Sequence, residues 1–223
     1  MATNLDLFGD HDDGAGAAQG GRILLGPQAM VLRGYALPVA EALLAGVDAV
    51  AAQAPFRHME TAGGYTMSVA LTNCGQLGWT SDARGYRYTR TDPQSGLPWP
   101  DMPEAFLRLA RDAAAEAGFP GFEPDACLVN RYEPGSRLSL HQDRNERDYG
   151  APIVSVSLGM PAMFLFGGDQ RTDKASRTPL FHGDVAVWGG VDRLRYHGIM
   201  PMKDLPHPRL GSRRINFTIR KAG

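Results

Sequence analysis

Cysteine, one-sided charge and long apolar runs are all scarce in this 223-residue chain. The two cysteines, Cys74 and Cys127, do not form a C-x-x-C pair, so the sequence offers neither a zinc finger nor a disulfide framework and suits a reducing compartment. No apolar run approaches the roughly 20 residues that a membrane-spanning helix needs, and the N-terminus lacks a signal-peptide pattern. We therefore expect a cytoplasmic protein with no membrane segment.

The net charge is also small, at −1. Residues 1–20 contain four Asp and neither Lys nor Arg, which leaves 23 basic against 20 acidic residues in the rest of the chain. Sequence-independent binding to nucleic-acid phosphates normally requires a clearly basic face, and this surplus does not supply one. The charge balance alone therefore does not indicate a nucleic-acid partner.

Glycine (27 residues) and proline (16 residues), in contrast, are plentiful, which favours a fold with many turns. Residues 1–21 are dominated by Gly, Ala and Asp, and we expect a mobile tail there that carries no chemistry. The remaining length, 22–223, is suitable for a single domain.

Helical and strand patterns occupy different parts of this domain. Helical spacing of apolar residues predicts helices over 38–54 and 103–117; the second has Asp101 and Glu104 in capping-box spacing and Gly118 at its end. Residues 60–100 are predicted to form short strands and hairpins, in a lid or binding loop. After residue 124 seven short β runs follow: ACLVNRY, SRLSLH, IVSVSLG, AMFLFGG, DVAVWGG, RLRYHGI and RINFTIR. The pattern predicts a mainly β (α+β) fold, a sandwich or jelly roll backed by two N-terminal helices.

The motif H-x-D, which can present an imidazole and a carboxylate from one face of a strand, occurs three times. Chance alone predicts roughly half an occurrence, so the context must decide. The pair at His11 lies in the expected tail, and the pair at His182 reads as a turn before a strand. If Gly189-Gly190 were a hairpin turn, however, His182 would lie opposite His197, which makes it a reserve ligand.

The third pair, His141 and Asp143, ends a predicted strand, and His197 follows 54 residues later. Two imidazoles and one carboxylate form a facial triad that suits Fe(II) and leaves coordination positions open for a bidentate keto acid and O₂. The far carboxylate of such an acid requires a fixed cation. Arg214 and Arg220 share one face of the last predicted strand, which indicates either a cofactor wall or an amphipathic strand with its polar side in water.

Six further segments extend these patterns over about residues 55–220: PFRHM (55–59), GGYTMSVALTNCGQLGWT (63–80), PDACLVNRYEPGSRLSLHQD (124–143), APIVSVSLGMPAMFLFGG (151–168), HGDVAVWGG (182–190) and YHGI with RINFTIR. Together they resemble the AlkB family of Fe(II)- and 2-oxoglutarate-dependent nucleic-acid demethylases, in particular its bacterial founding type. The resemblance implies a double-stranded β-helix (jelly-roll) core at 124–221 and a β-hairpin nucleotide-recognition lid at 60–90.

The resemblance also implies roles for individual residues. The iron ligands would be His141, Asp143 and His197. The 2-oxoglutarate contacts would be Asn130, Tyr132, Arg214, Asn216 and Arg220, with Arg214 on the distal carboxylate. The damaged nucleotide would meet Trp79, Tyr86, Tyr65, Thr61, Asn145 and Arg171, with its base stacked between Trp79 and His141.

The implied activity is oxidative demethylation of bases such as 1-methyladenine and 3-methylcytosine, with release of formaldehyde, succinate and CO₂. The implied substrate is alkylated single-stranded DNA, with double-stranded DNA and RNA left open, and we expect a monomer. Two positions depart from the founding type: Asn145 replaces an acidic residue that faces the base, and Gln76 replaces a lid histidine.

Two other functions remain open on the sequence. One is a dioxygenase of the same fold that hydroxylates a protein side chain or a small molecule. The other is a non-catalytic β-barrel binding module whose histidines are structural.

Overall fold

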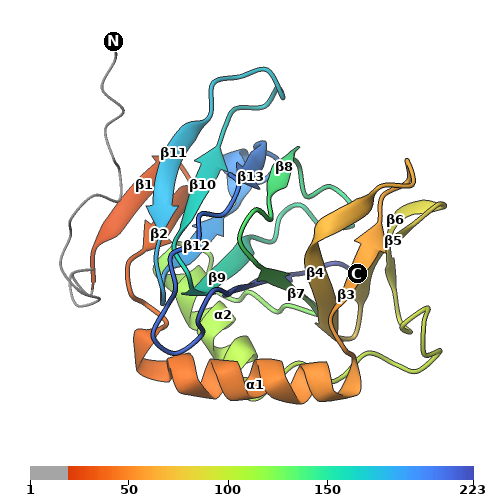
Figure 1. Ribbon diagram of the computed structural model, residues 1–223. Helices are drawn as coiled ribbons and strands as arrows, with labels where there is room; N and C mark the ends of the chain where they lie inside the picture. The colour runs from red at the N-terminus through yellow and green to blue at the C-terminus, as the bar shows by residue number, and fades with distance from the viewer. Residues whose placement is uncertain (1–19) are drawn as a thin grey trace, which may run out of the picture.

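Two antiparallel sheets face each other in the computed structural model, which describes residues 20–223 (Figure 1). The larger sheet runs in spatial order through β1 (Arg22–Gly26), β2 (Ala29–Leu32), β12 (Val185–Trp188), β9 (Ile153–Gly159), β14 (Arg214–Arg220), β7 (Ala126–Tyr132), β4 (Thr66–Gly75) and β3 (Arg57–Glu60). The smaller sheet runs through β11 (Ser176–Leu180), β10 (Ala162–Phe166), β13 (His197–Ile199) and β8 (Leu138–His141). A separate hairpin is formed by β5 (Gly78–Asp82) and β6 (Gly85–Thr89).

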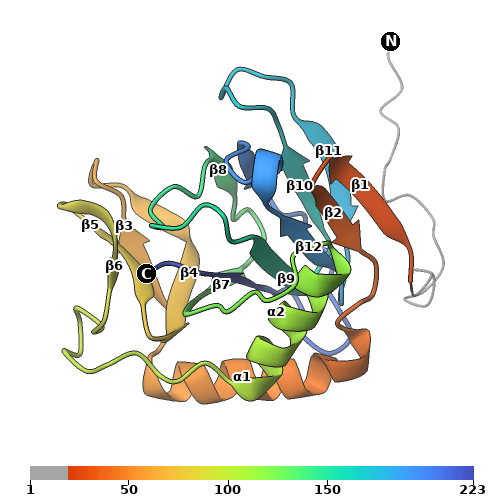
Figure 2. The same cartoon turned by 180° about the vertical axis from the view of Figure 1, so that it is seen from behind.

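Both predicted helices are present, and they cover the outer face of the larger sheet (Figures 1 and 2). A 3-10 turn at Leu37–Val39 leads into α1 (Ala40–Gln53), and α2 spans Glu104–Glu116. The predicted capping box of α2 is wrong: Pro103 is the N-cap residue, and no side chain caps it. Because Pro103 is the N-cap residue, Asp101 lies two residues too early for its carboxylate to accept from the first helical amides. Gly118, with φ +92°, ends the helix as predicted.

Two apolar cores result, one on each face of the larger sheet. The first packs the helices against residues such as Phe217, whose ring lies parallel to that of Phe106 at 4.4 Å. The second fills the space between the two sheets and contains Trp188 and Phe164. Strand side chains alternate between faces, so a residue of the larger sheet faces either the helices or the inter-sheet space.

All seven predicted β runs after residue 124 contain strands, and the jelly-roll prediction is confirmed at the level of two packed sheets. Strand β11 was not predicted. Its sequence, SRTPL, contains Pro179, which is tolerated because β11 is an edge strand that pairs on one side with β10. Strands β1 to β4 join the larger sheet although they precede residue 124. The expected tail lies outside the described residues except for residues 20 and 21, and the pair at His11 lies outside them altogether.

The described residues contain no helix that is long and apolar enough to cross a membrane.

Candidate metal centre

Two histidines lie opposite each other on the short strands β8 and β13, at one edge of the smaller sheet. His141 is the last residue of β8 and His197 the first of β13, and the antiparallel register places them directly opposite each other. Their ring centroids lie 4.4 Å apart. The 55 residues that lie between them in sequence fold into the intervening strands, so strand pairing brings the two imidazoles together.

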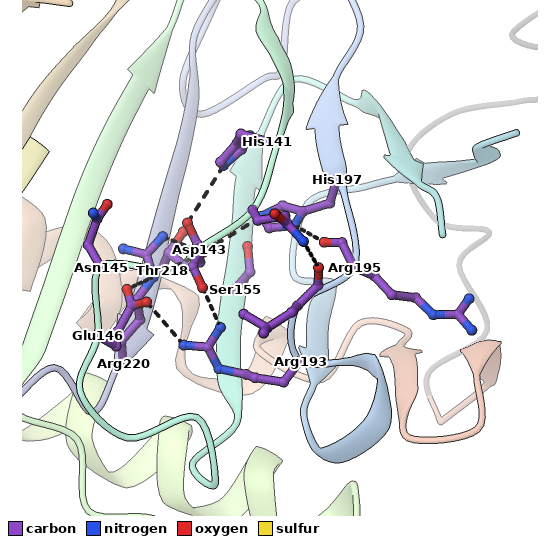
Figure 3. A network of polar contacts seen from close by, with 12 residues as sticks. His141, Asp143, Asn145, Glu146, Ser155, Arg193, Arg195, His197, Thr218 and Arg220 are labelled. Carbon is purple, nitrogen blue, oxygen red and sulfur yellow. Dashed lines mark hydrogen bonds and ion pairs between the residues drawn. The ribbon is translucent and has the colours of Figure 1, made fainter. Parts of the chain in front are cut away.

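Asp143 completes this group from the loop just after β8 (Figure 3). Its Oδ1 lies 3.7 Å from Nε2 of His141, and its Oδ2 lies 3.6 Å from Nε2 of His197. Two atoms that each bind one ion at about 2.1 Å can be no more than roughly 4.2 Å apart, so these distances suit ligands of a common ion. Among residues 20–223 this is the one group of three such side chains that could hold a metal.

The hydrogen bonds of the two imidazoles leave the correct nitrogen free for a metal. Nδ1 of His141 donates to the carbonyl of Ser139, and Nδ1 of His197 donates to the carbonyl of Arg195, each at 2.9 Å. Each ring therefore carries its proton on Nδ1 and offers the Nε2 lone pair. Burial, together with neighbouring His197, lowers the pKa of His141 to about 4, so this ring is neutral at pH 7.

The carboxylate of Asp143 is held in its charged form by Arg220 on β14. Nε and Nη2 of Arg220 donate to Oδ2 of Asp143 at 3.1 and 2.7 Å. Burial would raise the pKa of Asp143, but the Arg220 guanidinium and the two imidazoles hold that pKa well below its usual range. Two imidazoles and one carboxylate, with no thiolate, form a donor set that fits Fe(II).

A buried cation that forms no ion pair within residues 20–223 lies on the same polar face of β14. Arg214 is 1% exposed, and its Nη2 donates to Ser157 Oγ at 2.9 Å. Its Nε and Nη1 have no hydrogen-bond partner in the part of the chain that the structure describes. Because buried charges are normally paired, these two unsatisfied donors fit the carboxylate of a bound acid.

The polar face of β14 lies between the sheets, and not in water. All seven residues of β14 are buried, with Ile215, Phe217 and Ile219 packed in the core beneath the helices. The alternate residues face the other way: Asn216 donates to Ser155 Oγ and to the carbonyl of Val156, both at 2.8 Å. The polar wall expected for a cofactor is therefore present, and the amphipathic surface strand is excluded.

The comparisons with known proteins agree with this geometry. Residues 28–220 match the family model described as 2OG-Fe(II) oxygenase superfamily. The chain is 54% identical over 219 residues to Alpha-ketoglutarate-dependent dioxygenase AlkB of Escherichia coli (strain K12), covering 98% of each chain. It is 56% identical over 198 residues to AlkB of Salmonella typhimurium, covering 89% of this chain and 92% of that relative.

This chain belongs to the AlkB family of 2-oxoglutarate–Fe(II) dioxygenases.

The fold comparison agrees. The solved structure of OsALKBH1 superposes with a TM-score of 0.79 at 27% identity, covering 90% of this chain and all of that one. Membership of the AlkB family confirms Fe(II) and 2-oxoglutarate as the cofactors and His141, Asp143 and His197 as the metal site. The non-catalytic binding module is excluded.

The residues predicted to bind 2-oxoglutarate lie at matching positions of two neighbouring strands. Tyr132 pairs with Arg214, and Asn130 pairs with Asn216, in the register of β7 and β14. The guanidinium carbon of Arg214 lies 4.9 Å from the centroid of the Tyr132 ring. Nε and Nη2 of Arg220 are directed at Asp143. The roles of these five residues toward the cosubstrate stay predictions.

The residues predicted to bind the nucleotide fall into three groups. Trp79 on β5 stacks on Tyr86 of β6, with ring centroids 5.5 Å apart and planes 15° apart, and Nε1 of Trp79 donates to Oδ1 of Asn145 at 3.4 Å. Thr61 and Tyr65 form a separate turn, in which Thr61 Oγ1 accepts a hydrogen bond from the Tyr65 amide. Arg171 is exposed on the loop between β10 and β11.

The prediction of His182 as a reserve metal ligand is wrong. Gly189-Gly190 is not a hairpin turn, because β12 belongs to the larger sheet and β13 to the smaller one. The chain crosses between the sheets there through a 3-10 turn at Gly190–Asp192. His182 instead accepts a hydrogen bond from the Gly159 amide and stacks on His207 at 4.3 Å.

Arg193 is a site residue that the sequence did not reveal. This buried side chain precedes His197 by four residues, and its Nη1 donates to the carbonyl of Asp143 at 2.8 Å. It also pairs with Glu146 at 3.2 Å (Figure 3). Arg193 therefore ties the segment before one metal ligand to the loop of another. As the first residue of the predicted run RLRYHGI, Arg193 carries no sequence signal for such a role.

Proposed function

We propose that this dioxygenase removes alkyl groups from nucleic-acid bases, with 1-methyladenine and 3-methylcytosine in single-stranded DNA as its main substrates. The observation that supports this most strongly is the stacked pair of Trp79 and Tyr86, which touches the loop of the metal ligand Asp143 through Asn145. A flat aromatic platform beside an oxidising centre suits a flat substrate, and base–aromatic stacking contributes about 1–3 kcal/mol per base. Similarity to AlkB over nearly the whole chain supports the same substrate class.

Iron(II) and 2-oxoglutarate, when bound, supply the activation of O₂ that hydroxylates the alkyl carbon, and a hydroxymethyl group on a ring nitrogen is lost as formaldehyde. The protein itself binds and orients. We propose that Arg214 receives the distal carboxylate of 2-oxoglutarate, and that Asn130, Tyr132, Asn216 and Arg220 hold the rest of it. The chain need not provide a nucleophile or an acid–base pair.

Selectivity in this proposal comes from base extrusion. A base must leave the helix to reach the centre, and a lesion that already prevents Watson–Crick pairing lowers the cost of extrusion. The platform of Trp79 and Tyr86 would receive the extruded base, with His141 on its other side. Thr61, Tyr65 and Arg171 would contact the nucleotide around it.

Asn145 affects which lesions are preferred. Its amide has no charge, and the neighbouring carboxylate of Glu146 is buried and engaged with Tyr88 and Arg193. A cationic lesion therefore meets no free carboxylate at this position. We expect Asn145→Asp to raise the preference for cationic over neutral lesions, because it adds a negative charge beside the base.

The test is formaldehyde release from methylated single-stranded oligonucleotides, with product masses measured for a panel of lesions. We expect repair of 1-methyladenine and 3-methylcytosine. We expect Trp79→Ala to weaken oligonucleotide binding roughly tenfold, while 2-oxoglutarate binding is unchanged. Leu97→Ala, which shortens an exposed apolar side chain, is the control.

Failure to release formaldehyde from any lesion, by protein that still binds iron and 2-oxoglutarate, would contradict the proposed substrate. The result would point instead to a protein side chain or a small molecule, and would leave the dioxygenase intact.

The proposal also includes the organisation of the chain. We propose that residues 60–90 act as the nucleotide-recognition lid on a single domain, 22–223, with a core at 124–221. We further propose a monomer in the cytoplasm, where the two free, buried cysteines would remain reduced.

A further inference from the structure

The β5–β6 hairpin contacts the metal-ligand loop at two points. Trp79 of β5 and Tyr88 of β6 are directly opposite each other in the hairpin register, so their side chains lie on the same face. Trp79 donates to Oδ1 of Asn145 at 3.4 Å, and the Tyr88 hydroxyl donates to Oε1 of Glu146 at 2.6 Å. Asn145 and Glu146 are consecutive residues, two and three positions after Asp143. The cross-strand pair of Trp79 and Tyr88 thus contacts two consecutive residues of the metal-ligand loop.

Of these two contacts, the one made by Tyr88 is partly buried and continues to the metal site. Glu146 is 6% exposed, and its Oε1 lies 3.5 Å from Nε of Arg220. Nη1 of Arg220 lies 3.5 Å from the Tyr88 hydroxyl, and Nη2 donates to Oδ2 of Asp143. A continuous chain of contacts therefore runs from Tyr88 through Glu146 and Arg220 to a metal ligand.

The charges along this chain are balanced. Two carboxylates, of Asp143 and Glu146, face two buried guanidiniums, of Arg193 and Arg220 (Figure 3). Removing one member of such a group leaves the others buried and unpaired, which is costly and shifts the remaining side chains. Without Glu146, Arg220 would be held only by Asp143 and Tyr88 among these partners.

We propose that Tyr88 and Glu146 are positioning residues that couple the docked hairpin to the metal centre. Glu146 and Tyr88 fix the Arg220 guanidinium against Oδ2 of Asp143. Arg220 thereby leaves Oδ1, which lies 3.7 Å from Nε2 of His141, to face the metal position. The same contacts hold Trp79 beside that centre, so hairpin docking and metal binding stabilise each other.

This coupling is reciprocal by thermodynamic necessity. If the docked hairpin strengthens metal binding by some factor, bound metal must favour the docked hairpin by the same factor. If the network served only to stabilise the fold, a variant that lacks one of its members would have a lower unfolding midpoint and an unchanged metal affinity. Metal affinity and hairpin dynamics together therefore separate the two roles.

The experiment uses the full chain with Co(II) as a redox-stable substitute for iron, and with neither nucleic acid nor 2-oxoglutarate. Co(II) dissociation constants come from calorimetric titration, and hydrogen–deuterium exchange follows the amides of residues 78–89 with and without metal. In Tyr88→Phe and Glu146→Gln we expect Co(II) binding to weaken about ten- to a hundredfold, as expected for loss of a hydrogen bond to a charged group. We also expect faster exchange in the hairpin. In the wild type, Co(II) should slow that exchange.

Two controls match the variants. Tyr35→Phe removes a tyrosine hydroxyl near α2, and Asp82→Asn breaks the pair of Asp82 with Arg87 inside the hairpin. Both should bind Co(II) as the wild type does. Co(II) affinity within twofold of wild type in Tyr88→Phe and Glu146→Gln would overturn the proposal, even if both variants melt earlier. An exchange rate of the hairpin amides that is the same with and without Co(II) in the wild type would also overturn the proposal. Neither readout depends on the identity of the substrate.

Discussion

The Arg214 side chain shows how a single residue can favour function at the expense of stability. Its guanidinium is buried, and two of its three nitrogens have no hydrogen-bond partner among the described residues. Burial also lowers the pKa of Arg214. An unpaired buried cation is unfavourable for the fold until a carboxylate arrives.

Replacing this arginine by a neutral residue of similar length should therefore have opposite effects on stability and on binding. In Arg214→Met we expect 2-oxoglutarate affinity to fall at least about thirtyfold, as is typical when one partner of a buried charge pair is removed. The cosubstrate-free protein should melt at an equal or higher temperature. Calorimetric titration and thermal unfolding measure the two effects. A clear loss of stability without loss of 2-oxoglutarate binding would show that Arg214 has only a structural role.

At the scale of elements, the pairing of β8 with β13 determines the distance between the two histidine ligands. Gly198, which follows His197, passes so close to β8 that a Cβ atom there would lie 2.6 Å from the backbone oxygen of Leu138. The strands can approach closely enough to bring His141 and His197 together because residue 198 has no side chain.

Gly198→Ala should separate these strands and weaken Co(II) binding by at least about tenfold, with a loss of stability from the overpacked contact. Gly63→Ala is the control, since its added Cβ would make only ordinary van der Waals contacts, with the Tyr65 ring at 3.5 Å and with Thr61 Oγ1 at 3.9 Å. Metal titration of both variants checks the expectation. Unchanged affinity in Gly198→Ala would mean that the strand spacing does not control the site.

The start of α2 gives a second element-scale prediction. No side chain caps this helix, so Asp101→Ala should change the free energy of unfolding by less than about 0.5 kcal/mol. Phe106, fully buried and stacked on Phe217, should cost about 3–5 kcal/mol when changed to Ala. Urea denaturation compares the two. A loss of 1 kcal/mol or more in Asp101→Ala, roughly the value of an N-cap, would restore the capping box.

Local sequence patterns predicted most of the helices and strands, because these elements depend mainly on residues that are near each other in the sequence. The alternation in RINFTIR identified both faces of β14, and helical spacing located α1 and α2. The predictions that failed concern features that depend on residues far away in the sequence. The hypothesis that Gly189-Gly190 forms a hairpin turn placed His182 opposite His197. Tertiary packing, however, decides between a turn within one sheet and a crossing between two sheets. Strand β11 was missed because Pro179 suggests a turn unless the strand is known to lie at an edge.

At the scale of the whole molecule, the two sheets enclose the site and the hairpin closes its side. Figure 1 shows β5 and β6 next to β3 and β4, far from the β1 edge of the larger sheet. Resemblance over about residues 55–220 implied the three metal ligands, because they lie in two motifs that are recognisable in the sequence. The buried network of Tyr88, Glu146 and Arg193 was invisible, because its members come from three separate segments and none of them belongs to a motif.

The central claim is that His141, Asp143 and His197 bind one iron, with room left for 2-oxoglutarate. The most direct test is an anaerobic titration of Fe(II) into the protein with 2-oxoglutarate present, followed by the visible charge-transfer band of the chelate. The triad predicts a band that saturates at one iron per chain and is absent in His141→Ala, Asp143→Ala and His197→Ala. A band of full intensity in any of these three variants, or no band in the wild type, would contradict it.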